Sequence, residues 1–337
     1  MISKSIKLIV ISATIILCLS LSGLAQTRTR TSTPPAPSLM SSLPQSDAVA
    51  QVQIKRLIND VIPRVMANNP AKLAEINTNL DNFKNRTGLD ARSFEQIALG
   101  VRYTYPSEGI TKLVTAGLAR GTFNAGAMVA AGRLAANGKY REEKYAGKSV
   151  YIFNLDESIR LFGVIDLKIR ELAAAPLDSN TLAVGDPSSI RSVIDAAAGK
   201  KRTNADLIAL ATREPNAVVG FGGNISPQVI KNLDFGNASF VGDLSGVRQA
   251  YGSVETTEKD VNLFIGAKTV NADSAKNLGD TLEGLKMLGG VFIGRLTGAK
   301  GVLAKSALTN LSIATDANEL RIRTNVAQAD IGPLMGN

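Results

Sequence analysis

The chain has 337 residues, of which 45% are hydrophobic and 20% charged, and its formal net charge is +9. This composition is typical of a globular protein with a substantial core. The chain contains no histidine, which excludes Ser-His-Asp or Cys-His catalysis and a histidine-based zinc site. It also lacks tryptophan and has only 5% aromatic residues, so its core must be mainly aliphatic.

The N-terminus has the pattern of a bacterial export signal. Lys4 and Lys7 precede an apolar run, 8–21, and small residues follow before Gln26, so we expect residues 1–25 to be removed as a signal peptide. The single cysteine would leave with it, and the exported chain, periplasmic or extracellular, would contain no disulfide. The alternative is an uncleaved helix that anchors the protein in a membrane, because the run is close to the roughly 17 residues that a spanning helix needs.

The next segment, 26–42, is rich in Thr, Ser and Pro and is expected to be a flexible linker. A first folded half is then predicted at 43–155. Strands are indicated by alternating apolar and polar side chains, and helices by apolar stripes that follow capping residues such as Asn69 and Asn124. The predicted strands are 48–54, 97–103, 111–122, 139–145 and 148–154, and the predicted helices are 57–65, 70–87 and 125–136.

Residues 156–168 show neither period and are expected to connect this half to a second one, 169–337. The predicted strands of the second half are 171–177, 181–185, 216–225, 247–257, 261–270, 311–315 and 319–326, and its helices are 187–198, 205–213, 227–233, 272–296, 301–308 and 327–335. Both halves follow the order β-α-α-β-β-α-β-β. The sequence therefore predicts an α+β fold with a mainly antiparallel sheet covered by helices on one face, built from an internal repeat.

Three short motifs resemble exported bacterial proteins of unknown function that are built from such repeats. They are Leu43-Pro44-x-x-Asp47 before the first strand, Thr87-Gly88-Leu89-Asp90 before the next, and Leu182-Ala183-Val184-Gly185-Asp186 before a helix. The resemblance implies export and α+β folding. It carries over no functional residue.

A stripe of glycines is one candidate contact surface. Gly290, Gly294 and Gly298 are four residues apart, which places them on one side of the predicted helix 272–296 and its continuation. Such a stripe lets another backbone approach closely. We interpret it as packing on the sheet or a neighbouring helix, with an oligomer or membrane contact as the alternative; the apolar run around it is too short to span a bilayer.

Lys200, Lys201 and Arg202 form the densest basic group, in a predicted loop. Solvated surface charge is the simpler interpretation, and a contact for an anion is the alternative. Basic residues elsewhere are interspersed with acidic ones and are not interleaved with aromatic side chains, so we do not expect the protein to bind nucleic acid.

The remaining motifs do not indicate a catalytic or cofactor site. The glycine-rich stretches 220–224 and 294–301 lack the spacing of dinucleotide and phosphate loops, and the first is better explained by a strand bulge or by close backbone packing. No acidic run has the spacing of a calcium loop. We therefore assign no catalytic residue, cofactor or metal, and expect a non-catalytic exported protein that binds a protein, an envelope polymer or an apolar ligand such as a lipid. The alternative is a hydrolase or transferase that uses carboxylates, Ser, Lys or Tyr.

Overall fold

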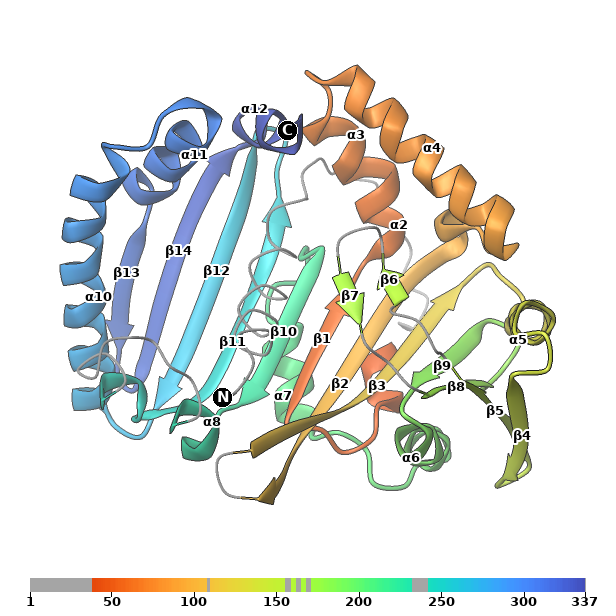
Figure 1. Cartoon of the computed structure of the whole chain (residues 1–337). Helices are drawn as coiled ribbons and strands as arrows, with labels where there is room; N and C mark the ends of the chain where they lie inside the picture. The colour runs from red at the N-terminus through yellow and green to blue at the C-terminus, as the bar shows by residue number, and fades with distance from the viewer. Residues whose placement is uncertain are drawn as a thin grey trace, which may run out of the picture.

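One antiparallel sheet of twelve strands organises the chain (Figure 1). The structure, a computed structural model, describes residues 38–336 apart from 108–109, 155–158, 162–164, 168–170 and 232–241. The strand order is β13-β14-β12-β11-β10-β1-β2-β3-β9-β8-β5-β4. The strands are β1 (Ala48–Val52), β2 (Phe94–Ser107), β3 (Ile110–Gly121), β4 (Tyr140–Tyr145), β5 (Lys148–Asn154), β8 (Glu171–Pro176), β9 (Thr181–Gly185), β10 (Val219–Asn224), β11 (Val247–Thr256), β12 (Asp260–Thr269), β13 (Ser312–Asp316) and β14 (Glu319–Ala327). The predicted α+β class with an antiparallel sheet is confirmed.

The two sequence halves share this sheet, which is joined where β1 pairs with β10 and Ala50 stands opposite Phe221. Strands β8 and β9, which we predicted to open the second half, pair with β5 and β3 of the first. The predicted boundary at 156–168 therefore does not divide the sheet, because local periodicity does not report which distant strand is the partner. Most of that connector lies outside the described residues, except for a small separate hairpin, β6 (Ile159–Leu161) with β7 (Ile165–Leu167).

Helices lie on both faces of the sheet, so the prediction of cover on one face is wrong. We call the face with Val49, Ala98 and Gly222 the closed face, and the face with Ala50 and Phe221 the open face. Against the closed face pack η1 (Leu39–Ser42), α6 (Pro187–Ala197) and α7 (Ala205–Ala211). Against parts of the open face pack α2 (Ile54–Arg56), η2 (Leu57–Val61), α3 (Ile62–Val65), α5 (Ala125–Ala135), α10 (Ala272–Ile293), α11 (Gly298–Thr309) and α12 (Gln328–Ile331).

The other helical segments are α4 (Pro70–Thr87), η3 (Ala91–Ser93), α8 (Pro227–Lys231) and η4 (Gly332–Gly336).

Strand β8 shows why helices cover both faces of the sheet. Ala173 and Ala175 are buried in the cluster that includes α6, whereas Ala174 between them is buried with α5. A strand whose consecutive residues are all apolar needs a cover on each face.

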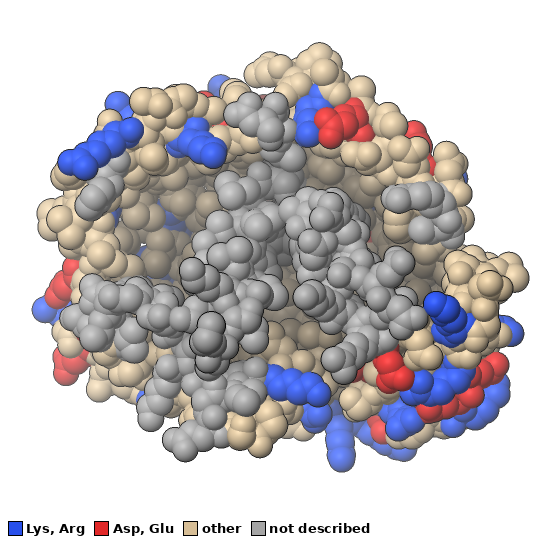
Figure 2. Space-filling model, viewed as in Figure 1, with Lys and Arg blue, Asp and Glu red and all other residues tan. Residues whose placement is uncertain are grey.

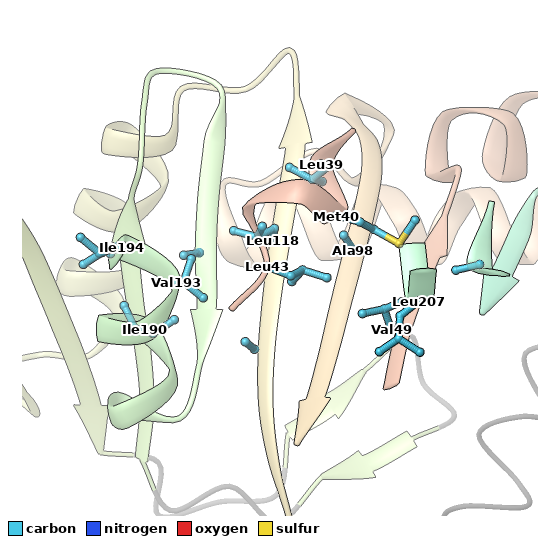
Figure 3. Packing of buried hydrophobic residues seen from close by; sticks show 14 of the residues in the cluster. Leu39, Met40, Leu43, Val49, Ala98, Leu118, Ile190, Val193, Ile194 and Leu207 are labelled. Carbon is cyan, nitrogen blue, oxygen red and sulfur yellow. The ribbon is translucent and has the colours of Figure 1, made fainter. Parts of the chain in front are cut away.

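The closed-face core begins earlier in the chain than predicted. Leu39 and Met40 of η1 are 0% exposed. In Figure 3 they lie with Leu43 between the α6 side chains and Leu207, over Ala98. The flexible linker predicted for 26–42 therefore cannot extend past residue 38, because its last apolar side chains fill the space between two helices; residues 26–37 lie outside the described residues.

Helix α7 approaches β10 so closely that two positions of the strand must be glycine. A Cβ atom on Gly220 would lie 2.0 Å from the carbonyl oxygen of Ala211, and one on Gly222 would lie 2.8 Å from the Cβ of Leu210. Real Cβ atoms do not approach other atoms so closely. The expectation of close backbone packing at this glycine-rich stretch is confirmed.

We expect Gly220→Ala to lower the free energy of unfolding by about 2 kcal/mol or more, because α7 must move away from β10. Urea denaturation measures this change. The control is Gly284→Ala in α10, where a Cβ would meet nothing within 4 Å and where alanine favours the helix by up to about 1 kcal/mol. Equal stability of the two variants would contradict the close approach.

Candidate apolar binding site

A row of apolar side chains crosses the open face from β9 to β13. Each residue of this row is paired in the sheet register with the next one, on the neighbouring strand. Residues that are paired in this way point to the same face of a sheet. We call this set the apolar row: Val184, Gly117, Leu99, Ala50, Phe221, Gly252, Ile265, Ile322 and Ile313. None of these side chains is polar, so the row forms one continuous apolar band across the sheet.

Helices cover this band at its margins, and two large side chains of the row are exposed between them. The neighbouring row, which includes Val52, Val219 and Val254, is buried with Val61 and Val65 of the first helices. In the apolar row, by contrast, Leu99 is 43% exposed and Ile265 is 44% exposed, while Ala50 and Phe221 between them are partly exposed and Gly252 is buried. Large exposed apolar patches on a folded chain usually mark a surface that binds something.

Small residues make the floor of this face smooth and low. A Cβ on Gly252 would lie 2.7 Å from Cζ of Phe221, and one on Gly117 would lie 3.4 Å from Cδ2 of Leu99, so both larger side chains lean across a glycine of the next strand. The parallel row beside them consists of Ala48, Gly223, Ala250 and Ala267. In Figure 2 the part of this side that is not hidden by grey residues is hollowed at the upper left, and most charged side chains in view lie around the rim.

A polar cavity of about 610 Å³ adjoins the floor where β1 and β11 begin and β10 and β12 end. Its lining includes Asp47, Tyr103, Arg248 and Lys268, and Tyr103 stands on the open face of β2, four residues after Leu99 of the apolar row. Asp47 accepts a hydrogen bond of 2.8 Å from the backbone N–H of Tyr103. Burial, and after it the charge of Asp47, raises the pKa of the Tyr103 hydroxyl. This cavity can therefore hold a polar group while the floor holds an apolar chain.

The closed face of β11 to β14 is polar by comparison and contains an ionic cluster. Glu319 accepts hydrogen bonds from Arg213 Nη1 at 2.9 Å, from Arg321 Nε at 2.9 Å and from the Tyr251 hydroxyl. The Arg213 guanidinium lies 5.1 Å from the centre of the Tyr251 ring, within the range of cation–π attraction. Arg323 lies 4.2 Å from the centre of the Phe264 ring.

The pKa values in this cluster are shifted by burial and by the close charges. Burial alone would raise the pKa of Glu319, but the hydrogen bonds from Arg321 and Tyr251 and the charge of Arg213 lower it to about 2. Burial, and after it the hydrogen bond to Glu319, raises the pKa of Tyr251. Neither residue belongs to the lining of the 610 Å³ cavity or of a smaller cavity beside Glu255. The hydrogen bonds and ion pairs of the cluster stabilise this face of the sheet.

A second cavity on the same face measures about 210 Å³ and includes Glu214, Ser253 and Glu255 in its lining. Burial, and after it the charge of Glu214, raises the pKa of Glu255. Glu214 is itself paired with Arg323 at 3.2 Å. Binding pockets for small molecules usually have about 300 to 1,000 Å³, so this cavity is small for a substrate.

The three predicted contact glycines do not share a helix face. Helix α10 ends at Ile293, and Gly298 begins α11 with a left-handed φ of 67°. Only Gly290 faces a neighbour: its Cβ would lie 3.9 Å from Leu308 of α11, whereas Gly294 lies near carbonyl oxygens of its own turn. The placement of all three glycines on one side of one helix is therefore wrong, because the left-handed Gly298 begins a separate helix, as two helices were predicted for this region. The oligomer contact itself stays a prediction.

The predicted basic group does not converge on one point. The Nε of Arg202 donates to the Ala196 carbonyl oxygen at 2.8 Å, which satisfies the C-terminal end of α6. Lys200 lies 3.8 Å from Asp195, and Lys201 takes a left-handed backbone conformation with φ 43° in the turn. These residues serve the turn after α6, and their contact with an anion stays a prediction.

Comparison with known proteins leaves the family open. No family model matches the chain, and no curated protein matches it. Solved structures of TP0453 are similar in part: crystal form III has a TM-score of 0.47 and 9% identity over 90% of this chain and 100% of that chain, and crystal form IV has 0.44 and 11% over 88% and 96%. Crystal form I has a TM-score of 0.43, with 9% identity, 89% of this chain and 96% of that chain covered. Scores this low support no argument about the protein.

No helix in the part of the chain that the structure describes is both long enough and apolar enough to cross a bilayer. Within the same residues, no group of three or more metal-ligating side chains is arranged to hold a metal ion.

We expect Glu319→Gln to lower the free energy of unfolding at pH 7 by about 2 kcal/mol, because Arg213 and Arg321 lose their shared carboxylate. Since the pKa of Glu319 is lowered on folding, its stabilising effect is present above about pH 4.5 and is lost as the pH falls toward 2. Urea denaturation of both proteins between pH 7 and pH 2.5 should therefore show the difference shrinking in acid.

The control is Asp316→Asn, because Asp316 pairs with the same Arg321 at 3.1 Å but its side chain is 69% exposed. We expect it to change the stability by less than about 0.5 kcal/mol. A difference between wild type and Glu319→Gln that does not change with pH would contradict the assignment.

Proposed function

We propose that this protein binds an apolar or amphipathic ligand, such as a molecule with a long acyl chain, on the open face of its sheet. The observation that supports this most is the apolar row, whose residues Leu99 and Ile265 are exposed while the row beside the first helices is buried. The predicted export signal would place this binding in the periplasm or outside the cell.

The free energy that an acyl chain gains when the floor buries it can be compared with the free energy that binding needs. Burial of one CH₂ group is worth about 0.8 kcal/mol. An acyl chain that buries about ten such groups on the floor gains about 8 kcal/mol before the entropic cost of association, which reduces the net affinity. Micromolar binding corresponds to a net gain of about 8 kcal/mol, so with an association cost of about 4 kcal/mol or more the ligand must bury about fifteen CH₂ groups or more on the apolar row.

The polar cavity supports an amphipathic rather than a purely apolar ligand. Arg248 brings one positive charge to its lining and Asp47 brings one negative charge, whereas Lys268 stands opposite Glu319 in the register and points to the closed face. The Arg248 Nη1 already donates to the carbonyl oxygens of Ser245 and Val247, which fixes its position. A head group that places a negative charge at Arg248 therefore suits this cavity.

The alternative of a carboxylate-based enzyme has less support from the described residues. It requires acids that converge in a cavity of adequate size. The pKa of Glu255 is raised, but the cavity beside it has only about 210 Å³. The strongly shifted Glu319 is held by arginines and lines no described cavity.

The direct test is mass spectrometry of the exported protein, purified without detergent and released from its ligand by organic solvent. We expect a co-purified lipid or fatty acid. A ligand-free protein that also fails to bind a fluorescent fatty acid in titration would contradict the proposal.

Substitution of the two exposed residues of the apolar row tests whether the ligand binds there. We expect Ile265→Gln combined with Leu99→Gln to weaken binding of a fluorescent fatty acid at least about tenfold, because each change removes apolar contact worth about 1 kcal/mol. The matched control is Leu134→Gln, which replaces a leucine that is 83% exposed on α5, away from the row. Equal affinity of the two variants would place the site elsewhere.

The cavity makes a separate contribution that can be measured with a pair of ligands. We expect Arg248→Gln to weaken binding of a fatty acid anion about fivefold, which corresponds to about 1 kcal/mol for one charge near the surface. Binding of the fatty alcohol with the same chain should not change. Titrations of both ligands distinguish a head-group site in the cavity from nonspecific apolar adsorption.

A further inference from the structure

A second apolar surface lies at the corner where α10 meets α11, and it is distinct from the apolar row. Helix α10 lies along the outer edge of the sheet beside β13, and α11 turns across the end of β14 (Figure 1). Six large apolar side chains are exposed here within 18 residues of chain. We call them, together with three basic residues, the basic corner: Leu285, Met287, Leu288, Val291, Leu296 and Val302, with Arg295, Lys300 and Lys305.

Helix α10 packs on the sheet before Gly284 and is exposed after it. Before that point Leu278 and Leu282 pack against the sheet with Leu320. After it, none of the α10 side chains that the structure describes belongs to a hydrophobic cluster, and Met287 is 73% and Val291 64% exposed. Helix α11 is anchored by its opposite side, where Leu303 and Ala307 join the core. The two helices are therefore held in place while their apolar outer surface has no cover among the described residues.

The charge of this corner indicates what could cover it. The sequence contains no acidic residue between Glu283 and Asp316, but four basic ones. One of these, Lys286, pairs with Glu283 at 3.5 Å. No partner is found within the described part of the chain for Arg295, Lys300 or Lys305. An apolar helical surface with cations beside it is the pattern of helices that lie in the interface of an anionic bilayer.

The geometry excludes a spanning helix and disfavours a second copy of this chain. The exposed apolar stretch, 285–296, rises only about 18 Å as a helix, whereas the hydrocarbon core is about 30 Å thick. In a symmetric dimer through this corner the cations of one protomer would face those of the other. A negatively charged lipid surface meets both the apolar and the basic side chains without that repulsion.

We propose that the basic corner docks the protein on the surface of a bilayer that contains anionic lipid, with α10 and α11 lying at the level of the head groups. The sequence analysis linked membrane contact to an uncleaved N-terminal helix or to a stripe of glycines. The contact proposed here is made by the exposed side chains of the corner, and it does not depend on ligand binding at the apolar row.

The test is co-sedimentation of the purified full chain with vesicles of phosphatidylcholine alone or mixed in equal parts with phosphatidylglycerol. We expect binding to the mixed vesicles only, weakened by added salt. Each cation near an anionic surface is worth about 1 kcal/mol, so Arg295→Gln combined with Lys300→Gln should bind about 30-fold more weakly. We expect Val291→Glu to bind at least about tenfold more weakly, and the control Leu134→Glu on α5 to bind like wild type.

Three results would overturn the proposal. They are no binding to the mixed vesicles, equal binding to both kinds of vesicle, and equal binding of Val291→Glu and Leu134→Glu, which is expected if only the N-terminal segment contacts lipid. Sedimentation velocity without vesicles is the second measurement: a dimer of the wild type that Val291→Glu dissociates would assign the corner to self-association instead. Urea denaturation of each variant checks that the fold is retained, as expected for residues so exposed.

Discussion

The central strands of the sheet carry apolar side chains on both faces, and this constraint determines how the rest of the molecule is arranged. On β1, Val49 is buried toward η1 and α7, while Ala50 and Val52 point to the other side. A sheet with two apolar faces needs two covers. The closed face has one, formed by η1, α6 and α7, but the described helices of the open face follow its margins. The candidate site is the part of the open face that they leave exposed.

The strands β11 to β14 show the same asymmetry in a simpler form. Their closed face is polar, and its two aromatic rings, Tyr251 and Phe264, are covered by the guanidinium groups of Arg213 and Arg323. Their open face carries Ile265 and Ile322. An antiparallel sheet with one polar face normally turns that face to water and the other to a core. Here the apolar face is only partly covered by a core, and this partial cover is the reason for proposing a ligand there.

Much of the fold could be predicted from the sequence, and the parts that could not have a physical reason. Periodicity and capping residues located most elements to within a few residues, as for the helix between Asn69 and Gly88, where Asn69 accepts from the Lys72 N–H and Gly88 has φ 71°. Pairing between distant strands leaves no local trace, so the exchange of β8 and β9 between halves was missed. The apolar row was missed for the same reason: Ala50, Phe221 and Ile265 each resemble ordinary core residues until the register places them side by side. Exposure at the end of α10 was also beyond sequence reasoning, because hydrophobic periodicity indicates a buried face whether or not a neighbour exists to bury it.

The seam between β1 and β10 has a consequence for how the chain is made. Residues 48–52 leave the ribosome early, yet one edge of that strand acquires its partner only when residues 219–224 have been synthesised. During that interval β1 is an unpaired edge, the kind of edge to which another extended chain can add. Contacts across so long a separation also slow the search for the native topology. The nascent chain therefore forms the hydrogen bonds between β1 and β10 late in synthesis. Until then, a chaperone that binds the nascent chain must cover the short apolar strand β1.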